Sequence, residues 1–200
     1  NGKTSTVEFC RQLWVLAGWK AASMGTLGTK TETAINKSVY KNKEENLTTF
    51  EPSDLYKKLN FLVEEKISHL ALEASSHGID QYRLDGVNFS GAVFTNLSHD
   101  HLDYHGNTAN YFSTKKRLFT KVLKNNSAIS INIDDIYGKK LYEELKDTNH
   151  FIITFGQCSK ADIKIKSVVQ NKQSIDLILE FKNQNFQTTI GMIGKFQLYN

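Results

Sequence analysis

The sequence predicts an α/β fold, in which a mostly parallel open sheet carries flanking helices and a small antiparallel β portion follows at the C-terminal end. Two observations favour this class. Through residues 1–157, short apolar runs alternate with segments of helical periodicity, which is the order of β-α-β units. In residues 158–200 the apolar period becomes two, which is typical of antiparallel strands. We expect both portions to belong to one domain that continues beyond the chain at each end.

The expected elements follow in order. Apolar positions from Val7 to Leu16 have helical spacing, and Pro52 stands at the first position of a second helical pattern over residues 52–66. The runs 69–75 and 91–96 are apolar and end in polar residues, as buried parallel strands do. The order continues with a helix at 110–123, a strand at 127–133, a helix at 135–145, a strand at 151–155 and antiparallel strands from residue 161 onward; residues 36–46 are expected to form an exposed loop.

Composition narrows the class of protein. The 200 residues are 40% hydrophobic and 23% charged, which suits a packed globular domain. We find no apolar run of membrane-spanning length and no signal peptide, so we expect a cytoplasmic protein without membrane insertion. The net charge of +4 comes from scattered lysines and does not favour nucleic-acid binding. Cys10 and Cys158 lie far apart without a CxxC pair, which argues against zinc and against a disulfide framework.

Gly2-Lys3-Thr4 reads as the end of a phosphate-binding loop. A helical pattern follows directly, so Lys3 would reach the β and γ phosphates and Thr4 would place its hydroxyl beside a nucleotide-bound magnesium ion. The tripeptide is weak evidence alone, and the alternative is an exposed Lys-Thr pair. Such a loop needs a strand before it, so we expect more chain on the N-terminal side.

Polar residues gather where two predicted strands end. Glu73 follows the run at 69–72, where its carboxylate could reach a magnesium ion. Ser76 and His77 are adjacent, which does not fit a nucleophile and its base, so we discount hydrolase chemistry. Residues 95–106 contain three His and two Asp within seven positions. One or two of these side chains could bind a metal ion, and magnesium is favoured over zinc because zinc ligands usually come from separate segments.

Taken in order, several motifs resemble the central domain of the Mur ligases. They are Glu-Ala-Ser-Ser-His-Gly-Ile-Asp-Gln-Tyr-Arg at 73–83, Val-Phe-Thr-Asn-Leu-Ser at 93–98, Asp-His-Leu-Asp-Tyr-His-Gly at 100–106 and Tyr-x-x-x-Lys at 111–115. The resemblance covers nearly the whole chain. It is strongest to the branch that adds a diamino acid to UDP-N-acetylmuramoyl-L-alanyl-D-glutamate in peptidoglycan synthesis, the pathway that supports cell-wall growth, cell shape and cell division.

The resemblance implies ATP-dependent amide synthesis and assigns roles to particular residues. The γ-phosphoryl group of ATP would pass to the glutamate carboxylate, and the incoming amine would attack the acyl phosphate, releasing phosphate beside ADP. The implied nucleotide contacts are Gly2, Lys3, Thr4 and Asn132, and the implied ligands of two Mg²⁺ ions are Thr4, Glu73, His101 and Lys115. The implied catalytic residues are Lys3, His101 and Lys115. The residues implied to bind the UDP-N-acetylmuramoyl-dipeptide are Thr48, Thr49, Ser75, Gln81 and Arg83.

Lys115 and Asn132 each have a functional interpretation and an alternative one. An ammonium group cannot ligate Mg²⁺, but the resemblance implies that CO₂ converts Lys115 to a carbamate, a hard oxygen ligand that suits this ion. The alternative is one more solvated lysine in Lys115-Lys116-Arg117. Asn132 belongs to an Asn-x-Asp-Asp motif whose Asn is implied to contact adenine, whereas Asp134 or Asp135 would also serve as a helix N-cap.

Three alternatives stay open at this point. A folylpolyglutamate synthase shares fold and chemistry, but the 73–78 and 100–106 motifs fit the cell-wall branch better. A nucleotide-binding module without chemistry and a basic nucleic-acid binder are the others. For the intact enzyme we expect a monomer that uses meso-diaminopimelate rather than L-lysine, and we expect this chain alone to be inactive.

Overall fold

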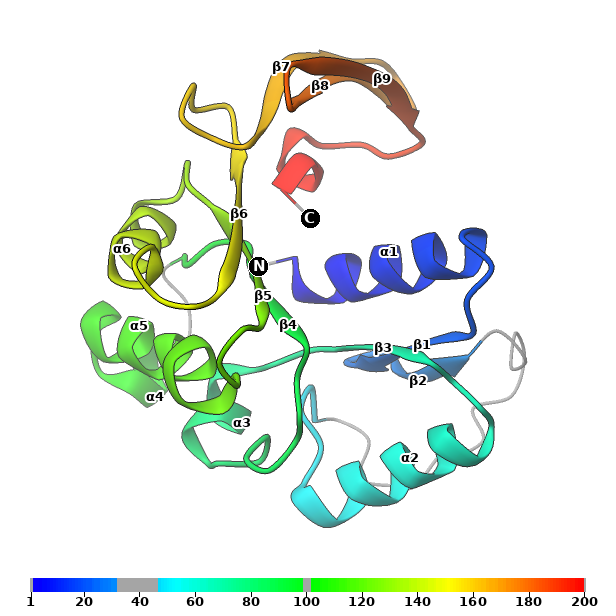
Figure 1. Ribbon diagram of the computed structural model, residues 1–200, viewed down its shortest axis with the longest axis vertical. Coiled ribbons are helices and arrows are strands. Elements are labelled where there is room, and N and C mark those ends of the chain that lie inside the picture. Colours follow the sequence, from blue (N-terminus) through cyan, green and yellow to red (C-terminus); the bar gives the residue numbers. More distant parts are fainter. Residues whose placement is uncertain (1, 32–46, 99–101, 200) are drawn as a thin grey trace. The chain divides into compact units, whose positions relative to one another are not determined.

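A computed structural model describes residues 2–31, 47–98 and 102–199 (Figure 1). The chain divides into two compact units, Gly2–Gly86 and Val87–Asn200, with Asn1 grouped with the second unit. The expected exposed loop at 36–46 and the candidate ligand His101 lie outside the described residues.

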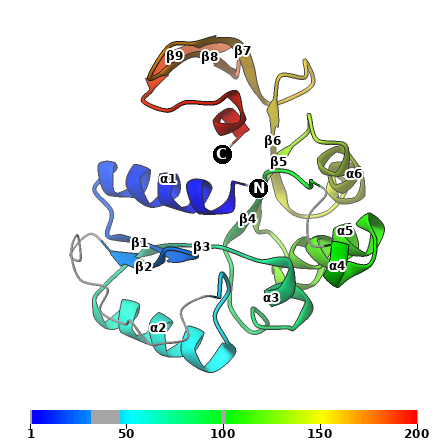
Figure 2. The same ribbon diagram turned by 180° about the vertical axis from the view of Figure 1, so that it is seen from behind.

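The unit Gly2–Gly86 has three layers. Its strand order is β2-β1-β3, with β1 antiparallel to β2 and parallel to β3. Helix α1 covers one face of this sheet and α2 covers the other, as the views from the front and from behind agree (Figures 1 and 2). The elements are α1 (Lys3–Leu16), β1 (Ala21–Gly25), β2 (Gly28–Thr31), α2 (Pro52–Glu64), β3 (His69–Leu72) and α3 (Ser76–Asp80).

Both long helices of this unit and strand β3 are found where the sequence predicts them. Helix α2 begins at Pro52, whose missing N–H costs nothing at that position, and it buries Leu55 and Leu62. The β1–β2 hairpin was not predicted. All five residues of β1 are buried, so this strand lacks the alternation of apolar and polar residues that marks a half-exposed strand.

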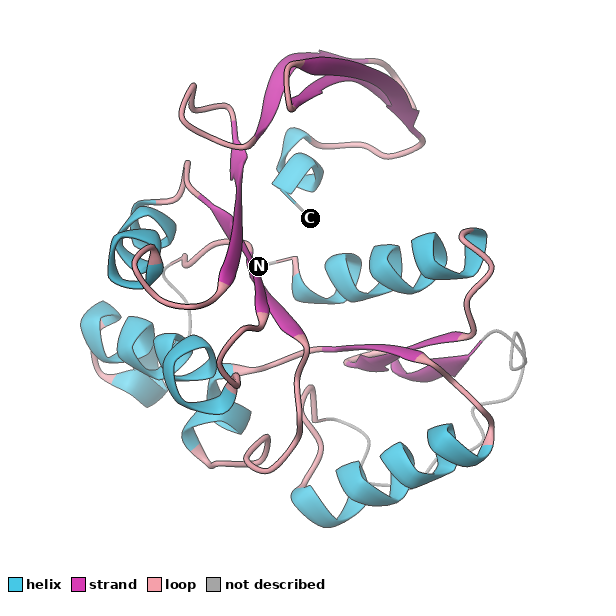
Figure 3. Cartoon of the chain, in the orientation of Figure 1, coloured by secondary structure: helices cyan, strands magenta, loops and turns pink. Residues whose placement is uncertain are grey.

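The unit Val87–Asn200 contains a six-stranded sheet with the order β4-β5-β6-β7-β8-β9. The pairings from β4 to β7 are parallel, and those from β7 to β9 are antiparallel. Figure 3 shows the helices beside the parallel strands and the antiparallel ribbon at the other end. The elements are β4 (Gly91–Phe94), α4 (Leu102–His105), α5 (Thr108–Arg117), a π-helix (Leu118–Val122), β5 (Ala128–Asn132), α6 (Ile136–Leu145), β6 (Phe151–Gly156), β7 (Ile163–Gln170), β8 (Ile175–Phe181), β9 (Gln184–Ile190) and a 3₁₀-helix (Lys195–Tyr199).

The core of this second unit lies between the parallel strands and the helices. Ile129 and Ile131 of β5 are buried together with Phe112, Phe119 and Leu141 from the helices. The helix expected at 110–123 is interrupted: α5 ends at Arg117 and the chain continues as a π-helix. Phe119 lies in this π-helix and packs edge-on against Phe94 of β4, with ring centroids 6.1 Å apart.

The predicted α/β class is confirmed, including the antiparallel portion at the C-terminal end. The sequence predicts one open sheet, whereas the described strands form two sheets. Alternation of elements along a chain predicts that strands are parallel but not which strands are neighbours, so this division could not be read from periodicity. Within the described residues no helix is long and apolar enough to span a membrane.

Candidate active site

Gly2, Lys3 and Thr4 form the beginning of α1. Gly2 is the N-cap residue with a φ of 84°, and as a glycine it has no side chain with which to cap the helix. The first turn contains no acidic residue, and no acidic side chain in the described part of the chain pairs with Lys3. The first amides of a helix carry partial positive charge and lack intrahelical partners, so this end of α1 suits an anion.

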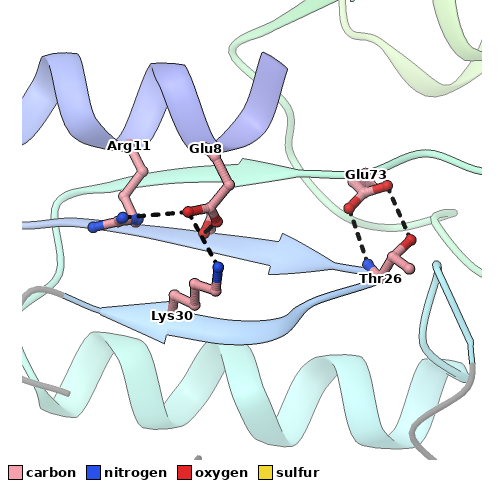
Figure 4. Close-up of polar contacts among 6 residues, drawn as sticks. Glu8, Arg11, Thr26, Lys30 and Glu73 are labelled. Atoms are coloured by element: carbon pink, nitrogen blue, oxygen red, sulfur yellow. Dashed lines mark hydrogen bonds and ion pairs between the residues drawn. The ribbon is translucent and has the colours of Figure 1, made fainter. Parts of the chain in front are cut away.

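The carboxylate of Glu73 lies against Thr4 and the β1–β2 turn. Its Oε2 accepts a hydrogen bond from Thr4 Oγ1 at 3.1 Å. Thr26 donates two more, from its Oγ1 to Oε2 at 3.3 Å and from its amide to Oε1 at 2.9 Å (Figure 4). Glu73 is only 2% exposed. Gly25 makes this approach possible, because a Cβ there would lie 2.1 Å from Glu73 Oε1.

Glu73 is buried, and the described residues provide no counter-charge for it. Its hydrogen-bond donors are a backbone amide and two hydroxyl groups, and no ion pair to Glu73 is found among residues 2–31, 47–98 and 102–199. Buried carboxylates are normally paired with a cation or bound to a metal ion. An oxygen ligand beside a threonine hydroxyl at a helix N-terminus has the chemistry that a nucleotide-bound Mg²⁺ requires, since this ion takes one or two protein ligands and fills its shell with water and phosphate oxygens.

Described residues offer no richer metal centre. No group of three or more His, Cys, Asp or Glu side chains gathers in the part of the chain that the structure describes. The residues present therefore fit a magnesium ion that depends on phosphate oxygens, and they do not fit a structural zinc site.

Thr49 and Ser75 form a second polar cluster in the same unit. Thr49 is 2% exposed, and its hydroxyl donates to the carbonyl of Glu73 at 3.0 Å while accepting from the amide and the hydroxyl of Ser75, both at 2.9 Å. Ser75 is also the N-cap of α3, where its hydroxyl accepts from the Gly78 amide at 3.0 Å. The cluster thus fixes the segment that follows Glu73.

Arg83 extends this cluster. Its Nη1 donates to the Thr49 carbonyl at 2.9 Å, and its Nη2 contacts Gln81 Oε1 and lies 2.8 Å from Glu51 Oε1. The Arg83 side chain is 12% exposed while that of Glu51 is 51% exposed, and the Arg83 Nε atom is buried without a partner in the described residues. A guanidinium suits carboxylate or phosphate, and here its Nη2 already pairs with the carboxylate of Glu51.

Thr26 connects the two clusters and was missed by sequence reasoning. Its hydroxyl lies 3.1 Å from that of Thr48, and because Thr26 donates to Glu73, Thr48 is left as the donor in this contact. Thr26 follows the buried strand β1, so the available signal was a polar residue at the end of an apolar run. That signal could be used only after β1 had been recognised.

Lys115 and Asn132 belong to the unit Val87–Asn200. Lys115 is half-buried near the end of α5, and its Nζ lies 5.1 Å from the ring centroid of Tyr111, one turn earlier on the same helix. The Tyr111 ring stacks in turn on His105 with centroids 5.0 Å apart. The Tyr-x-x-x-Lys spacing therefore aligns the lysine over a buried aromatic ring.

Asn132 is buried at the end of β5 and joins two segments. Its Nδ2 donates to the Thr95 carbonyl at 2.8 Å, and its Oδ1 accepts from the Asp134 amide at 2.9 Å. Asp135 is the N-cap of α6, accepting from the amides of Tyr137 and Gly138, both at 2.9 Å. The prediction that one of the two aspartates caps the helix is confirmed for Asp135.

The predicted site residues thus fall into two groups, because Gly2–Gly86 and Val87–Asn200 are separate units. The first unit brings together the predicted residues Thr4, Glu73, Thr48, Thr49, Ser75, Gln81 and Arg83, and it also contains Gly2 and Lys3. The second contains Lys115 and Asn132, and the position of His101 is outside the described residues.

Comparison with known proteins assigns the class of this chain. A family model described as the Mur ligase middle domain matches residues 1–200, and the chain belongs to that family.

Particular relatives are UDP-N-acetylmuramoyl-L-alanyl-D-glutamate–2,6-diaminopimelate ligases. The one from Anaplasma marginale (strain St. Maries) is 39% identical over 201 residues, which cover 100% of this chain and 41% of the relative. A solved structure of such a ligase has a TM-score of 0.84 and 28% identity, covering 100% of this chain and 39% of its own. An FPGS–AMPPCP complex has a TM-score of 0.67 at 9% identity, covering 98% of this chain and 53% of its own, which shows a shared fold alone.

Proposed function

We propose that this chain is the ATP-binding part of an amide ligase that adds a diamino acid, meso-diaminopimelate in our reading, to UDP-N-acetylmuramoyl-L-alanyl-D-glutamate. The observation that carries the proposal is the buried Glu73 carboxylate beside Thr4 at the N-terminus of α1, in a chain that is 39% identical to a curated diaminopimelate ligase. The chain spans 41% of that relative's length, so the complete reaction is proposed for the full-length protein.

The α1 end is proposed to hold the nucleotide. Lys3 and the first amides of α1 would bind phosphate oxygens, and Thr4 with Glu73 would hold one magnesium ion. That ion, when bound, neutralises charge that develops on the phosphates. The γ-phosphoryl group passes from ATP to the substrate carboxylate, giving ADP and an acyl phosphate. Attack of the amine on the acyl carbon then forms the amide and releases phosphate.

His101 and Lys115 are proposed to hold a second magnesium ion, with Lys115 as a carbamate formed from CO₂. The contact between Lys115 and Tyr111 supports part of this proposal. Lys115 is half-buried with its Nζ beside the buried Tyr111 ring, so it is not a freely solvated chain. A carbamate supplies two carboxylate-like oxygens, which suit magnesium.

Thr48, Thr49, Ser75, Gln81 and Arg83 are proposed to bind the UDP-N-acetylmuramoyl-dipeptide. The support is geometric: all five lie in one unit, and hydrogen bonds connect Thr49 to Ser75 and to Arg83. Arg83 is the member suited to an anionic group of the substrate. Asn132 is proposed to contact adenine. Its hydrogen bonds to Thr95 and Asp134 leave one Nδ2 hydrogen and one Oδ1 lone pair for such a contact.

The proposed cellular setting follows from the reaction. A ligase that uses ATP and a nucleotide-linked precursor would act in the cytoplasm in cell-wall synthesis, and we propose a monomer. Nucleic acid is not among the proposed partners.

The Lys115→Ala variant of the full-length protein tests the proposed chemistry. Phosphate release that depends on both the UDP-linked dipeptide and diaminopimelate should fall by at least about 10³-fold, because a charge-stabilising ligand is lost. A short carboxylic acid added to the assay should restore part of the activity. The matched control is Lys116→Ala, which removes the neighbouring exposed partner of Glu144 and should leave activity within about twofold.

Any one of three results would overturn the proposal. Full activity of Lys115→Ala without an additive would exclude the carbamate. Turnover with a folate substrate but none with the UDP-linked dipeptide would indicate a folylpolyglutamate synthase. ATP binding without any acceptor-dependent turnover would indicate a nucleotide-binding module without chemistry.

A further inference from the structure

Asp134 is the centre of a hydrogen-bonded cluster that the proposed function does not use. Its carboxylate accepts from the amide of Gln157 at 2.6 Å, from the amide of Cys158 at 2.9 Å and from the Tyr199 hydroxyl at 3.0 Å. Asp134 therefore connects three segments that are distant in sequence: the turn between β5 and α6, the turn after β6, and the 3₁₀-helix Lys195–Tyr199.

The backbone around this cluster is shaped for the carboxylate. A Cβ at Gly156 would lie 2.7 Å from both Cγ and Oδ1 of Asp134, so only glycine allows the β6 end to approach this closely. The Ile133 amide also donates to the Phe155 carbonyl at 3.0 Å. The two turns are thus joined on both sides of Asp134.

Tyr199 donates to this carboxylate from its side chain, whereas Gln157 and Cys158 donate from their backbone amides, and its hydroxyl is partly buried. Burial, together with the hydrogen bond to Asp134 and the negative charge of that group, raises the pKa of Tyr199 to about 12. The hydroxyl therefore stays protonated and remains a donor at neutral pH. A hydrogen bond to a charged acceptor is worth more than one between neutral groups.

The cluster is directly coupled to Asn132. Asn132 Oδ1 accepts from the amide of Asp134, so the position of the Asn132 amide group depends on how the Asp134 turn is held. The Asn132 Nδ2 is fixed at its other side by the Thr95 carbonyl at the end of β4. A shift of the Asp134 turn must move or rotate the Asn132 side chain or break one of these two bonds.

We propose that Tyr199 is a positioning residue for the nucleotide base, which acts through Asp134 to hold Asn132 in the orientation that receives adenine. The inference rests on the proposed function, because it takes Asn132 as an adenine contact. It adds that nucleotide affinity depends on the 3₁₀-helix Lys195–Tyr199, a segment that is connected to Asn132 through Asp134.

The test compares Tyr199→Phe with wild type in the full-length protein, by calorimetric titration with ADP and by steady-state kinetics. Loss of the hydroxyl should weaken ADP binding about three- to tenfold, because this factor corresponds to part of the free energy of one hydrogen bond to a charged group. KM for ATP should rise by the same factor, while KM for the UDP-linked dipeptide and kcat stay within about twofold. Asp134→Asn, which replaces the carboxylate with a weaker acceptor, should raise KM for ATP further.

Tyr142→Phe is the matched control. It removes a tyrosine hydroxyl from α6 in the same unit, at a residue whose side chain makes no hydrogen bond with the described residues, and it should leave ADP affinity unchanged. This control separates loss of a hydroxyl from loss of this particular contact.

Each outcome has a distinct meaning. If the wild type binds ADP, and both Tyr199→Phe and Asp134→Asn bind it with the same affinity as the wild type, the inference is overturned and the proposed function is unaffected. An equal loss of kcat and of affinity for both substrates also overturns it, because that result describes general destabilisation. A wild-type protein that binds no ADP overturns the proposed function itself.

Discussion

Two carboxylates that contact the same three-stranded sheet are held in opposite ways (Figure 4). Glu8 on α1 accepts a hydrogen bond from Ser23 and lies 3.3 Å from Arg11 Nη2 and 3.5 Å from Lys30 Nζ. Glu73 is buried more deeply, yet its donors within the described residues are a backbone amide and two threonine hydroxyls. Glu8 has its counter-charges in the chain, whereas the described residues provide none for Glu73.

A structural carboxylate and a functional one can be separated by whether the chain itself stabilises the charge. Burial raises the pKa of Glu8, but the Ser23 hydrogen bond and the charges of Lys30 and Arg11 outweigh burial and lower the pKa below its ordinary value of 4.5. The fold alone therefore stabilises the ionised form of Glu8. A buried carboxylate without such partners costs free energy, and it is retained where a ligand supplies the missing positive charge.

The largest effect is expected for Glu73→Gln. The amide keeps the shape and the acceptor oxygen but removes the charge, so ligase activity of the full-length protein should fall by at least about 10³-fold in kcat/KM. Thermal stability should be equal or higher, because an unpaired buried charge is lost. Acceptor-dependent phosphate release and scanning calorimetry measure both quantities. Activity within about tenfold of wild type would remove the distinction between the two carboxylates.

Gly25→Ala tests the position of the Glu73 carboxylate, because it moves this group instead of neutralising it. The added Cβ would lie 2.1 Å from Glu73 Oε1, so the Glu73 side chain must shift away from Thr26. We expect kcat/KM to fall about 10- to 100-fold, since misplacement of a group by about 1 Å has this effect. Gly191→Ala is the control, because a Cβ at Gly191 meets no atom within 4 Å. Equal activities of the two alanine variants would contradict the role of this close approach.

Glu8→Gln should have the opposite profile to Glu73→Gln. It removes the attraction to Arg11 and Lys30, so the free energy of local opening of β1 and β2 should fall by about 1–2 kcal/mol. Native-state hydrogen exchange of the strand amides measures this quantity. Ligase activity should stay within about twofold of wild type. A large loss of activity with unchanged exchange would mean that Glu8, too, is part of the site.

The smallest effect concerns pH. Because the pKa of Glu8 is lower in the folded state than the ordinary 4.5, the folded protein binds fewer protons at this group than the unfolded chain does. The stabilisation from Glu8 is therefore complete above about pH 4.5 and is lost as the pH falls through the lowered value. Local opening of β1 and β2 in wild type and Glu8→Gln should converge in acid. A difference that stays constant down to pH 3 would contradict the pKa shift.

Sequence reasoning predicted the elements that have a clear period or a marked boundary. The α2 helix is identified by Pro52 and by Leu55 and Leu62 at helical spacing, and β7 to β9 by their period of two. Strand β1 was missed because all five residues of Ala21–Gly25 are buried and all but Met24 are small, so it has neither a period nor β-branched side chains. Because β1 was not predicted, the roles of Gly25 and Thr26 at its end could not be predicted either.

The site was predictable as a set of residue types but not as a set of contacts. Glu73 stands out as a carboxylate at a strand end, yet its lack of a counter-charge is a property of what surrounds it in space. The same holds for Asp134, where the sequence offered only a possible helix cap, while the structure connects it to Tyr199 across 65 positions. Hydrogen bonds between distant segments leave no periodic signal in the sequence.

The claim that the Glu73 carboxylate helps to hold the nucleotide's metal ion is tested by measuring, with electron paramagnetic resonance, the binding of Mn²⁺ with AMPPCP to the full-length protein. Wild type and Glu8→Gln should bind the metal–nucleotide complex with equal affinity, and Glu73→Gln should bind it at least about 30-fold more weakly, because a charged oxygen ligand is lost. Equal affinities of all three proteins would show that the buried Glu73 carboxylate does not hold the nucleotide's metal ion, and would contradict the account.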